Sequence, residues 1–523
     1  MDEPSLSEET MKKTLYINKL KPPTEKIKME VNLEDALDLA GAGKYQLFHC
    51  TLMLATLSAA LIEMIGSAFI LPAAACDLDL PDSLKGILIS MPNIGVILTA
   101  PFWGRAADSL GRKPVLLCSA AASGVLGFAA SVMPNLVTFA LCKLAASLFL
   151  SCPSSLGWAY ASEMLPQKRR DLALLIMNGF LTTSSTLSPL LAWGILPFDW
   201  TQIGIQVHPW RFLTAAYALP LLLVAVWLTQ AKESPKFLMT KGKQQEALTV
   251  LGHIYARNHG APVDAYPVTA LKKSNGKSDH ASEEGSSCEL APIRRSETAC
   301  ALLRPPHLKW LALTGFLMFG LFSLLNGLFL FAPDTINKVM QGSGEEEGTI
   351  CIIMNQAVNE TVSPDCVDSI SQDTFIIMAV TTVVYGLAVM AVSLIPISKK
   401  TLLVGMYFCV GTNCLLSGLL KNRTVAGIMM SALQITALGI GPLTAYAVQL
   451  FPTTLRGTAV GAVLMFGRLG SVVGANAAGA LLAAACAAAF YGFAALLFLC
   501  AALSLLLPGN RSAPSEVQSE AET

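Results

Sequence analysis

The stretch Gly104-Arg-Ala-Ala-Asp108-Ser-Leu-Gly111-Arg112-Lys113 separates two long apolar blocks of the chain. Gly104 and Gly111 permit a tight turn, because glycine adopts backbone conformations that other residues avoid. Asp108 can meet a neighbouring helix N-terminus or a cation, and Arg112 and Lys113 are typical of the cytosolic side of a membrane. The stretch therefore predicts a tight connection between two membrane-spanning helices.

Apolar blocks of this kind recur along the whole chain of 523 residues, which is 53% hydrophobic and 14% charged, with a mean hydropathy of +0.55. Each block approaches the ~20 residues that a helix needs to cross a bilayer. Backbone groups in lipid must bond within their own segment, and the alternating pattern of barrel strands is absent. We predict an all-α polytopic membrane protein with transmembrane helices at 47–74, 86–104, 113–132, 134–158, 171–193, 211–230, 308–332, 373–395, 401–420, 424–449, 457–481 and 484–507.

These twelve helices form two groups of six, separated by a polar stretch that we interpret as a partly disordered linker. Tandem six-helix halves with a site between them permit transport by alternating access. The predicted parts are a cytosolic tail 1–46, a first half 47–231, a cytosolic linker 232–307, a second half 308–508 with an external loop 334–372, and a cytosolic tail 509–523.

A short internal repeat also supports two related halves. Three residues that follow the fourth predicted helix have counterparts after the tenth, each 286 residues further along the chain. Repeats of this kind indicate that both halves descend from one unit. The residues are Glu163, Pro166 and Arg170, and then Gln449, Pro452 and Arg456.

The orientation follows from basic residues in the short loops, which favour the cytosol. The opposite side carries the acidic loop 334–372, so we expect both termini in the cytosol. The basic loop residues are Arg105, Arg112, Lys113, Lys168, Arg169, Arg170, Lys399, Lys400 and Arg456.

The stretch 104–113 resembles the signature of the major facilitator superfamily, although Ser109 stands where that family usually has arginine. The resemblance implies a conformational latch on the cytosolic side, and an ordinary positively flanked turn is the simpler alternative. The expected latch residues are Gly104, Asp108, Gly111, Arg112, Glu163, Arg170 and Arg456.

Other segments resemble the branch of this family that contains synaptic vesicle glycoprotein 2, close to the organic-ion and sugar porters. Gln449 and Lys143 depart from that branch, which often has Glu and Arg at these positions. The segments are His208-Pro-Trp210-Arg211, Glu233-Ser-Pro-Lys236-Phe, Phe331-Ala-Pro-Asp334 at the expected end of the seventh helix, and Gln449-Leu-Phe-Pro-Thr453.

Three ionisable residues, Glu63, Lys143 and Arg468, lie well inside predicted spans. A charge at a helix centre costs at least ~2.5 to 3.5 kcal/mol in lipid unless it faces the bundle interior, so we expect all three to line a cavity. Glu63 can couple protons, face a cation or form a fixed structural ion pair. Lys143 can also extend to the membrane surface. Arg468 resembles a basic position of organic-anion carriers, which implies an anionic or zwitterionic substrate.

Polar and aromatic side chains in the predicted helices are further cavity candidates. Most of them could equally form hydrogen bonds between helices. These residues are Asn93, Trp193, Asn326, Tyr385, Tyr407, Asn413 and Gln434.

The external loop contains Cys351 and Cys366, with the glycosylation sequon Asn359-Glu-Thr361 between them. Disulfides and N-glycans form in an oxidising lumen. We therefore predict a Cys351–Cys366 disulfide and a glycan on Asn359.

The sequence favours a secondary transporter for a small organic, possibly charged, solute in the plasma membrane or in a secretory or synaptic-type vesicle membrane. Its expected partners are the solute, the lipid bilayer and a coupling proton or ion. The alternative is a transporter-like membrane glycoprotein that acts as a receptor, trafficking or regulatory subunit. A formal net charge of +0 gives no reason to expect nucleic-acid binding. No pattern predicts an enzyme, a metal site or a cofactor.

Overall fold

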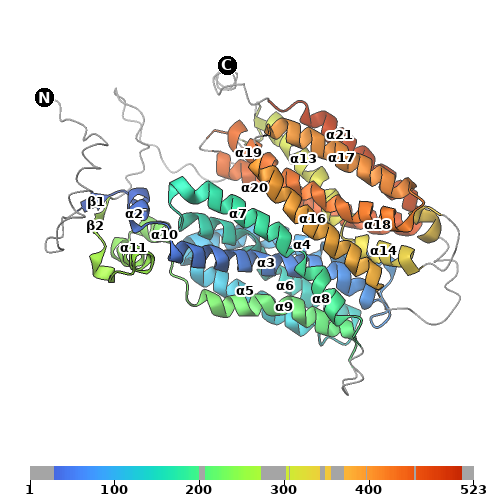
Figure 1. The fold of residues 1–523 in the computed structure, drawn as a ribbon, viewed down its shortest axis with the longest axis horizontal. Coiled ribbons are helices and arrows are strands. Elements are labelled where there is room, and N and C mark those ends of the chain that lie inside the picture. The colour runs from blue at the N-terminus through green and yellow to red at the C-terminus, as the bar shows by residue number, and fades with distance from the viewer. Residues whose placement is uncertain are drawn as a thin grey trace. The chain divides into compact units, whose positions relative to one another are not determined.

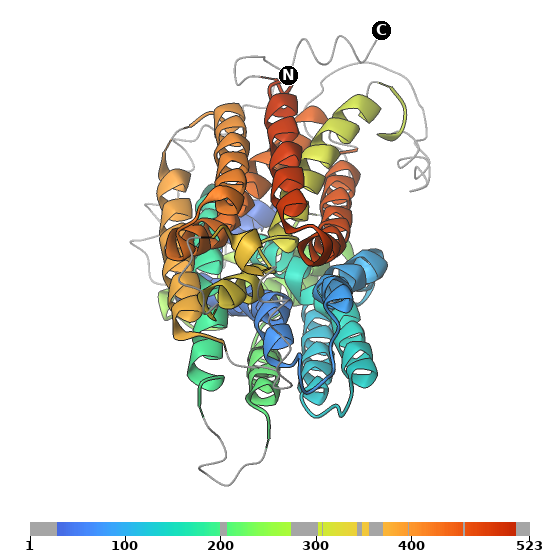
Figure 2. The same cartoon turned by 90° about the vertical axis from the view of Figure 1, so that its right-hand side faces the viewer.

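The computed structural model describes residues 29–198, 207–272, 302–305, 307–341, 348–354, 370–395, 397–452 and 455–508. Within these ranges, twelve helical spans are long and apolar enough to cross a membrane. Each overlaps one of the twelve predicted ranges, which confirms the all-α polytopic fold. Figure 2 shows the orange and red helices of the second half on one side and blue and cyan helices of the first half on the other.

Among the described residues, the first half contains six spans, and the fifth consists of two consecutive helices. The turn between the second and third spans lies at Gly111, whose φ of 113° suits glycine, as the sequence predicted. The helices, labelled in Figure 1, are α3 (Lys44–Ala73), α4 (Asp82–Leu110), α5 (Arg112–Ala130), α6 (Leu136–Glu163), α7 (Gln167–Ser184) with α8 (Leu187–Ile195), and α9 (Pro209–Leu228).

The second half begins several of its helices with side-chain caps. Ser371, Ser398 and Asn422 each accept a hydrogen bond from the backbone N–H three residues further on. Such caps satisfy amides that have no partner inside the helix. The helices are α13 (His307–Asn326), α14 (Ala332–Gln341), α16 (Gln372–Leu394), α17 (Lys399–Leu419), α18 (Arg423–Ser431) with η3 (Ala432–Gly439) and α19 (Ile440–Leu450), α20 (Arg456–Ala484) and α21 (Cys486–Ser504).

The seventh predicted helix is interrupted. α13 ends at Asn326, and α14 begins at Ala332 inside what we expected to be the end of one continuous helix. Gly327 lies so close to α20 that a Cβ would be 2.9 Å from the Gly474 carbonyl oxygen. Pro333 lacks an N–H and is therefore suited to a first helical turn. The prediction that Phe331-Ala-Pro-Asp334 ends the helix was wrong, and part of the predicted loop 334–372 is α14.

α20 carries two faces of small residues. Gly467, Gly470 and Gly474 pack against α13, and Gly470 and Gly474 approach its backbone. On another face, a Cβ at Gly86 of α4 would lie 2.8 Å from the carbonyl oxygen of Ala475. Small residues allow membrane helices to approach closely. α20 is thus packed against its own half and against the first half.

A disulfide joins Cys351 to Cys486, with sulfurs 2.02 Å apart and Cα atoms 5.4 Å apart. The predicted Cys351–Cys366 pair was therefore wrong. Cys486 is the first residue of α21 and lies inside the predicted helix 484–507. Cys366 and Asn359 lie outside the described residues, so the glycan stays a prediction. We call the bundle end that carries this bond the disulfide end, and the end with Gly111 the turn end.

A second, smaller unit is built from the N-terminal segment, residues 162–171 and the polar stretch after α9. β1 (Met29–Val31) pairs in parallel with β2 (Val268–Leu271). The Asn258 side chain bonds to backbone groups of Ala40, Gly41 and Tyr45. The polar composition did not predict these elements. Its helices are α2 (Leu33–Ala40), α10 (Pro235–Thr240), α11 (Gln244–His259) and η2 (Val263–Ala265).

Candidate functional site

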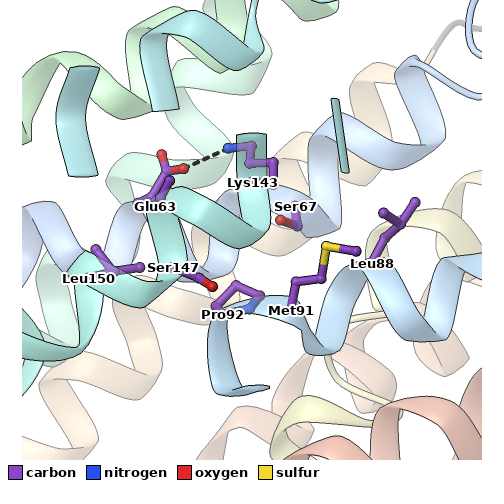
Figure 3. Close-up of a pocket in the computed structure, with 9 residues that line it drawn as sticks. Glu63, Ser67, Leu88, Met91, Pro92, Lys143, Ser147 and Leu150 are labelled. Atoms are coloured by element: carbon purple, nitrogen blue, oxygen red, sulfur yellow. Dashed lines mark hydrogen bonds and ion pairs between the residues drawn. The ribbon is translucent and has the colours of Figure 1, made fainter. Parts of the chain in front are cut away.

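Glu63 of α3 and Lys143 of α6 form an ion pair inside the first half (Figure 3), with Nζ 2.6 Å from Oε1. Both side chains are buried, at 4% and 9% exposure. The sequence predicted that Glu63 needs a compensating charge, and the structure supplies Lys143. A single charge buried in lipid or in a protein interior carries a large free-energy cost. Two opposite charges in contact reduce that cost for each other.

The pair borders a small cavity between α3, α4 and α6. Ser67 and Ser147 add polar groups to a lining that is otherwise apolar, with Leu88, Met91 and Pro92 (Figure 3). The cavity volume in which the centre of a water molecule can lie is about 10 Å³. This is close to the minimum volume that can hold one water. In the described part of the chain, the second oxygen of the Glu63 carboxylate, Oε2, has no hydrogen-bond partner. The cavity can supply one water or proton to this carboxylate, but it cannot hold an organic solute.

Arg468 of α20 lies where the two halves meet. Its Nη1 donates a hydrogen bond of 2.9 Å to Oδ1 of Asn93 on α4. The Asn93 side chain in turn donates from Nδ2 to Oδ1 of Asn326 on α13, over 3.3 Å. The guanidinium carbon of Arg468 is 5.5 Å from the centre of the Phe322 ring. Three of the predicted cavity residues, Arg468, Asn93 and Asn326, therefore form one polar cluster.

The charge environment of Arg468 differs from that of Lys143. Among the residues that the structure describes, no carboxylate lies within 4.0 Å of the Arg468 guanidinium. Its polar partner is the neutral amide of Asn93. A guanidinium binds carboxylates and phosphates in a two-point geometry that an amide oxygen does not offer. Arg468 is thus a cationic group between the halves that an anion could still bind.

Other polar contacts hold the first and second halves together at the disulfide end. Lys85 of α4 reaches Asp334 of α14, with Nζ 3.4 Å from Oδ2, and Lys338 binds the same oxygen at 3.2 Å. Deeper in the bundle, Gln434 of η3 donates a hydrogen bond of 3.0 Å to Ser185, which follows α7. Lys85 and Asp334 were not predicted as site residues, because both lie at or beyond the ends of the predicted helices, where charges are common.

At the turn end, three glycines of the same helices have no close neighbour among the described residues. Cβ atoms built at Gly104 of α4 and at Gly457 and Gly461 of α20 would have no described atom within 4 Å. Asp108 of α4 instead pairs at 3.1 Å with Arg112, the first residue of α5, across the turn at Gly111. We predict that in an outward-open state Asp108 approaches the start of α20, near Gly457, where it would meet a helix N-terminus.

Arg170, another predicted latch residue, belongs to the smaller unit and binds the Glu34 carboxylate of α2 at 3.0 and 3.1 Å. It also donates to the Leu165 carbonyl oxygen at 3.1 Å. Lys168 lies 3.4 Å from Asp38 of the same helix. The latch roles of Glu163 and Arg456 stay predictions.

Two predicted cavity residues form hydrogen bonds between helices of the second half. The sequence had left this role open as an alternative to substrate contact. The Tyr407 hydroxyl donates to the Leu317 carbonyl oxygen at 2.7 Å, and Asn413 donates to that of Met429 at 2.8 Å. Tyr385 is buried and its hydroxyl has no partner among described residues, whereas Trp193 is exposed. Substrate contact by these two stays a prediction.

The segment His208-Pro-Trp210-Arg211 anchors the start of α9. Asp77 accepts hydrogen bonds from Trp210 Nε1 at 3.0 Å and from Arg211 at 2.8 Å. Arg211 also bonds to the carbonyl oxygens of Ser131 and Met133. This cluster joins three connections at the disulfide end of the first half, so its role is structural.

Curated relatives lie in the vesicle glycoprotein branch. The chain is 31% identical to synaptic vesicle glycoprotein 2A of Rattus norvegicus over 246 residues, which are 46% of this chain and 33% of that protein. It is 31% identical to synaptic vesicle glycoprotein 2C of Rattus norvegicus over 239 residues, which are 44% of this chain and 33% of that protein. The matches span about a third of the length of these relatives.

Solved transporter structures share the fold. An inward-open structure of the xylose transporter XylE from E. coli has a TM-score of 0.63 and 15% identity, and the match covers 90% of this chain and 99% of that one. A crystal structure of a D-xylose-proton symporter has a TM-score of 0.57 and 16% identity, covering 88% and 98%.

The family predicted from the 104–113 stretch is confirmed by a wider match. Residues 52–419 match the family model of the Major Facilitator Superfamily, which is more than half of the chain. The twelve membrane-spanning helices and the shared transporter fold agree with that match. This chain is therefore an integral, multi-pass membrane protein that belongs to the Major Facilitator Superfamily.

Proposed function

We propose that this protein is a secondary transporter that moves a small anionic or zwitterionic organic solute between its two halves by alternating access. The observation that carries the proposal is Arg468, a cation between the halves whose polar partner in the described structure is a neutral amide. A cation at this depth is costly unless something compensates it, and a solute anion would do so. Membership of a transporter family supports the same conclusion.

The Glu63–Lys143 pair is the proposed coupling site. It lies within one half, so rocking of the halves need not break it, and its carboxylate borders a cavity of water size. Binding of a proton to Glu63 would break its ion pair with Lys143, so a proton-coupled transport cycle can use this pair as its switch. The simpler alternative is a fixed structural ion pair.

The proposed orientation places the disulfide end outside the cytosol. Disulfides form in oxidising compartments, and the basic loop residues Arg112 and Lys113 lie at the turn end. Both termini would then be cytosolic. A plasma membrane or a secretory vesicle membrane suits this orientation, and the names of the vesicle glycoprotein relatives agree with the second.

The test is uptake by purified protein in sealed proteoliposomes. A panel of radiolabelled benzoate, glutamate and taurine provides one carboxylate, one zwitterion with a net negative charge and one sulfonate. We expect uptake of at least one of them, with a loss of roughly ten-fold or more in Arg468→Gln, because a charge-assisted hydrogen bond is lost. Absence of uptake for the whole panel, with the protein folded, would favour the alternative role as a receptor, trafficking or regulatory subunit.

A second variant separates coupling from structure. If Glu63 couples protons, Glu63→Gln should abolish uphill, pH-driven accumulation and leave solute exchange intact. If the pair is structural, the same change should lower folding yield and leave the pH dependence unchanged, because Lys143 loses its countercharge, at a cost of roughly 3–5 kcal/mol. Glu63→Gln combined with Lys143→Met removes both charges and should recover the yield. Normal yield and undiminished pH-driven uptake in Glu63→Gln would defeat both roles.

A further inference from the structure

Asn93 accepts a hydrogen bond from Arg468 that would have to break when an anion binds to this arginine. Its Oδ1 accepts the hydrogen bond from Arg468, at 2.9 Å, and its Nδ2 donates to Asn326 at 3.3 Å. The side chain is 1% exposed. Because a guanidinium only donates and Asn326 presents its carbonyl oxygen, the amide of Asn93 is oriented by both neighbours.

The contact also lies at a particular depth. From the disulfide end, α4 touches α20 first at Gly86, then through Ser90 and Asn476 at 3.4 Å, and then through Asn93 and Arg468. Further along α4, Gly104 faces open space. Among these contacts, the Asn93–Arg468 bond lies nearest the turn end, and the Arg468 side chain is partly exposed there.

An amide oxygen and a solute anion compete for the same donor. A carboxylate or sulfonate accepts charge-assisted hydrogen bonds from a guanidinium, and these are stronger than the bond to a neutral amide. An anion that binds Arg468 from the open side would therefore displace Asn93 Oδ1. The displaced amide belongs to the first half and the arginine to the second, so binding would break a bond between the halves.

We infer that Asn93 acts as an internal substitute for the substrate anion: it occupies Arg468 in the empty carrier, and the solute releases α4 from α20 by replacing it. The inference rests on the proposed function, since it assumes that Arg468 binds the solute. Asn93 is a positioning residue here, because it acts through Arg468.

The test measures closure of the disulfide end in purified protein without any solute. Spin labels at Leu84→Cys and Ala480→Cys, both exposed in this structure, report the separation of α4 and α20, after the free cysteines have been replaced. Asn93→Ala should lower the ratio of closed to open populations at least three-fold. Asn93→Asp should raise it at least ten-fold, because a carboxylate then pairs with Arg468, and Arg468→Gln in the same chain should cancel the gain.

Asn476 provides a matched control. It is also an asparagine between α4 and α20, and it bonds to Ser90 rather than to a cation. Asn476→Asp should therefore not raise the closed population. If Asn93→Asp does not raise it, or if Asn476→Asp raises it equally, the inference is overturned.

A last experiment tests whether benzoate, glutamate or taurine displaces Asn93 from Arg468. At least one of these solutes should lower the closed population of the disulfide end in the parent protein, as Asn93→Ala does. None of them should lower it in the Asn93→Asp variant. A parent protein that none of the three opens would overturn displacement. Uptake distinguishes the two proposals: shifted populations without uptake contradict the transport function alone, and uptake without any population shift contradicts the role of Asn93 alone.

Discussion

The two ends of the α4–α20 pair are built from similar residues but are packed differently. At the disulfide end, Gly86 lies against backbone atoms of Ala475 and Asn476. At the turn end, Gly104 and Gly457 have no described atom near the position of a Cβ. The helices are antiparallel, so these glycines occupy corresponding places at opposite ends of one interface.

This difference indicates what the glycines of the turn end are for. A glycine inside a helix costs roughly 0.5–1 kcal/mol relative to alanine, and no close contact explains Gly104, Gly457 or Gly461 in this state. If the halves rock, the turn end closes while the disulfide end opens, and small residues are then needed there. Under the proposed alternating access, this structure represents the state that is closed at the disulfide end.

The largest predicted effect comes from blocking one end at a time. Gly86→Leu places a side chain where the Ala475 carbonyl oxygen is 2.8 Å from the Cβ, so the closed disulfide end becomes unfavourable by about 1–3 kcal/mol. The closed-to-open ratio there should fall roughly 5- to 150-fold. The Leu84/Ala480 spin-label pair measures this ratio.

Gly104→Leu is the matched variant at the other end. A leucine side chain at position 104 would contact no described atom in this state. The variant should therefore leave the disulfide end closed and should oppose closure of the turn end. If Gly86→Leu and Gly104→Leu shift the populations in the same direction, the two ends do not alternate.

A smaller effect is expected from the charges at the disulfide end. Lys85→Gln removes an ion pair between the halves, whereas Lys338→Gln removes one within α14. We expect Lys85→Gln to lower the closed population roughly five-fold, corresponding to about 1 kcal/mol, and Lys338→Gln to change it less than two-fold. The same label pair measures both, and equal effects would show that Lys85 does not bridge the halves.

The smallest effect on this balance is expected from the disulfide. Cys351 and Cys486 both belong to the second half, so their bond does not join the halves. Cys351→Ser with Cys486→Ser should change the populations less than two-fold and lower the Tm, because the bond closes a long chain loop and is worth roughly 2–4 kcal/mol. A large population shift would indicate that residues 348–354 take part in closure.

The twelve helices were predictable because lipid leaves a backbone few alternatives, and the apolar blocks are long. Pairing of Glu63 was predictable for the same reason, since a lone carboxylate is costly in a membrane. The sequence could not choose its partner between Lys143 and Arg468, because that depends on which helix faces lie together.

Features that depend on packing between distant segments were not predictable. Cys486 lies in an apolar block, and its pairing with Cys351, 135 residues away, depends on the tertiary arrangement of the two segments. The break after Asn326 depends on contact between Gly327 and α20. Tyr407 and Asn413 could be placed in the second half, but not on the face that bonds to a neighbouring helix.

The most direct test of alternating access is a pair of distances measured on the same protein in proteoliposomes. One label pair, Leu84→Cys with Ala480→Cys, reports the disulfide end, and the other, Ser109→Cys with Thr458→Cys, reports the turn end. The account predicts reciprocal changes: Gly86→Leu should lengthen the first distance and shorten the second, and Asn93→Asp should do the opposite. Distances that change together, or that stay fixed in both variants, would contradict it.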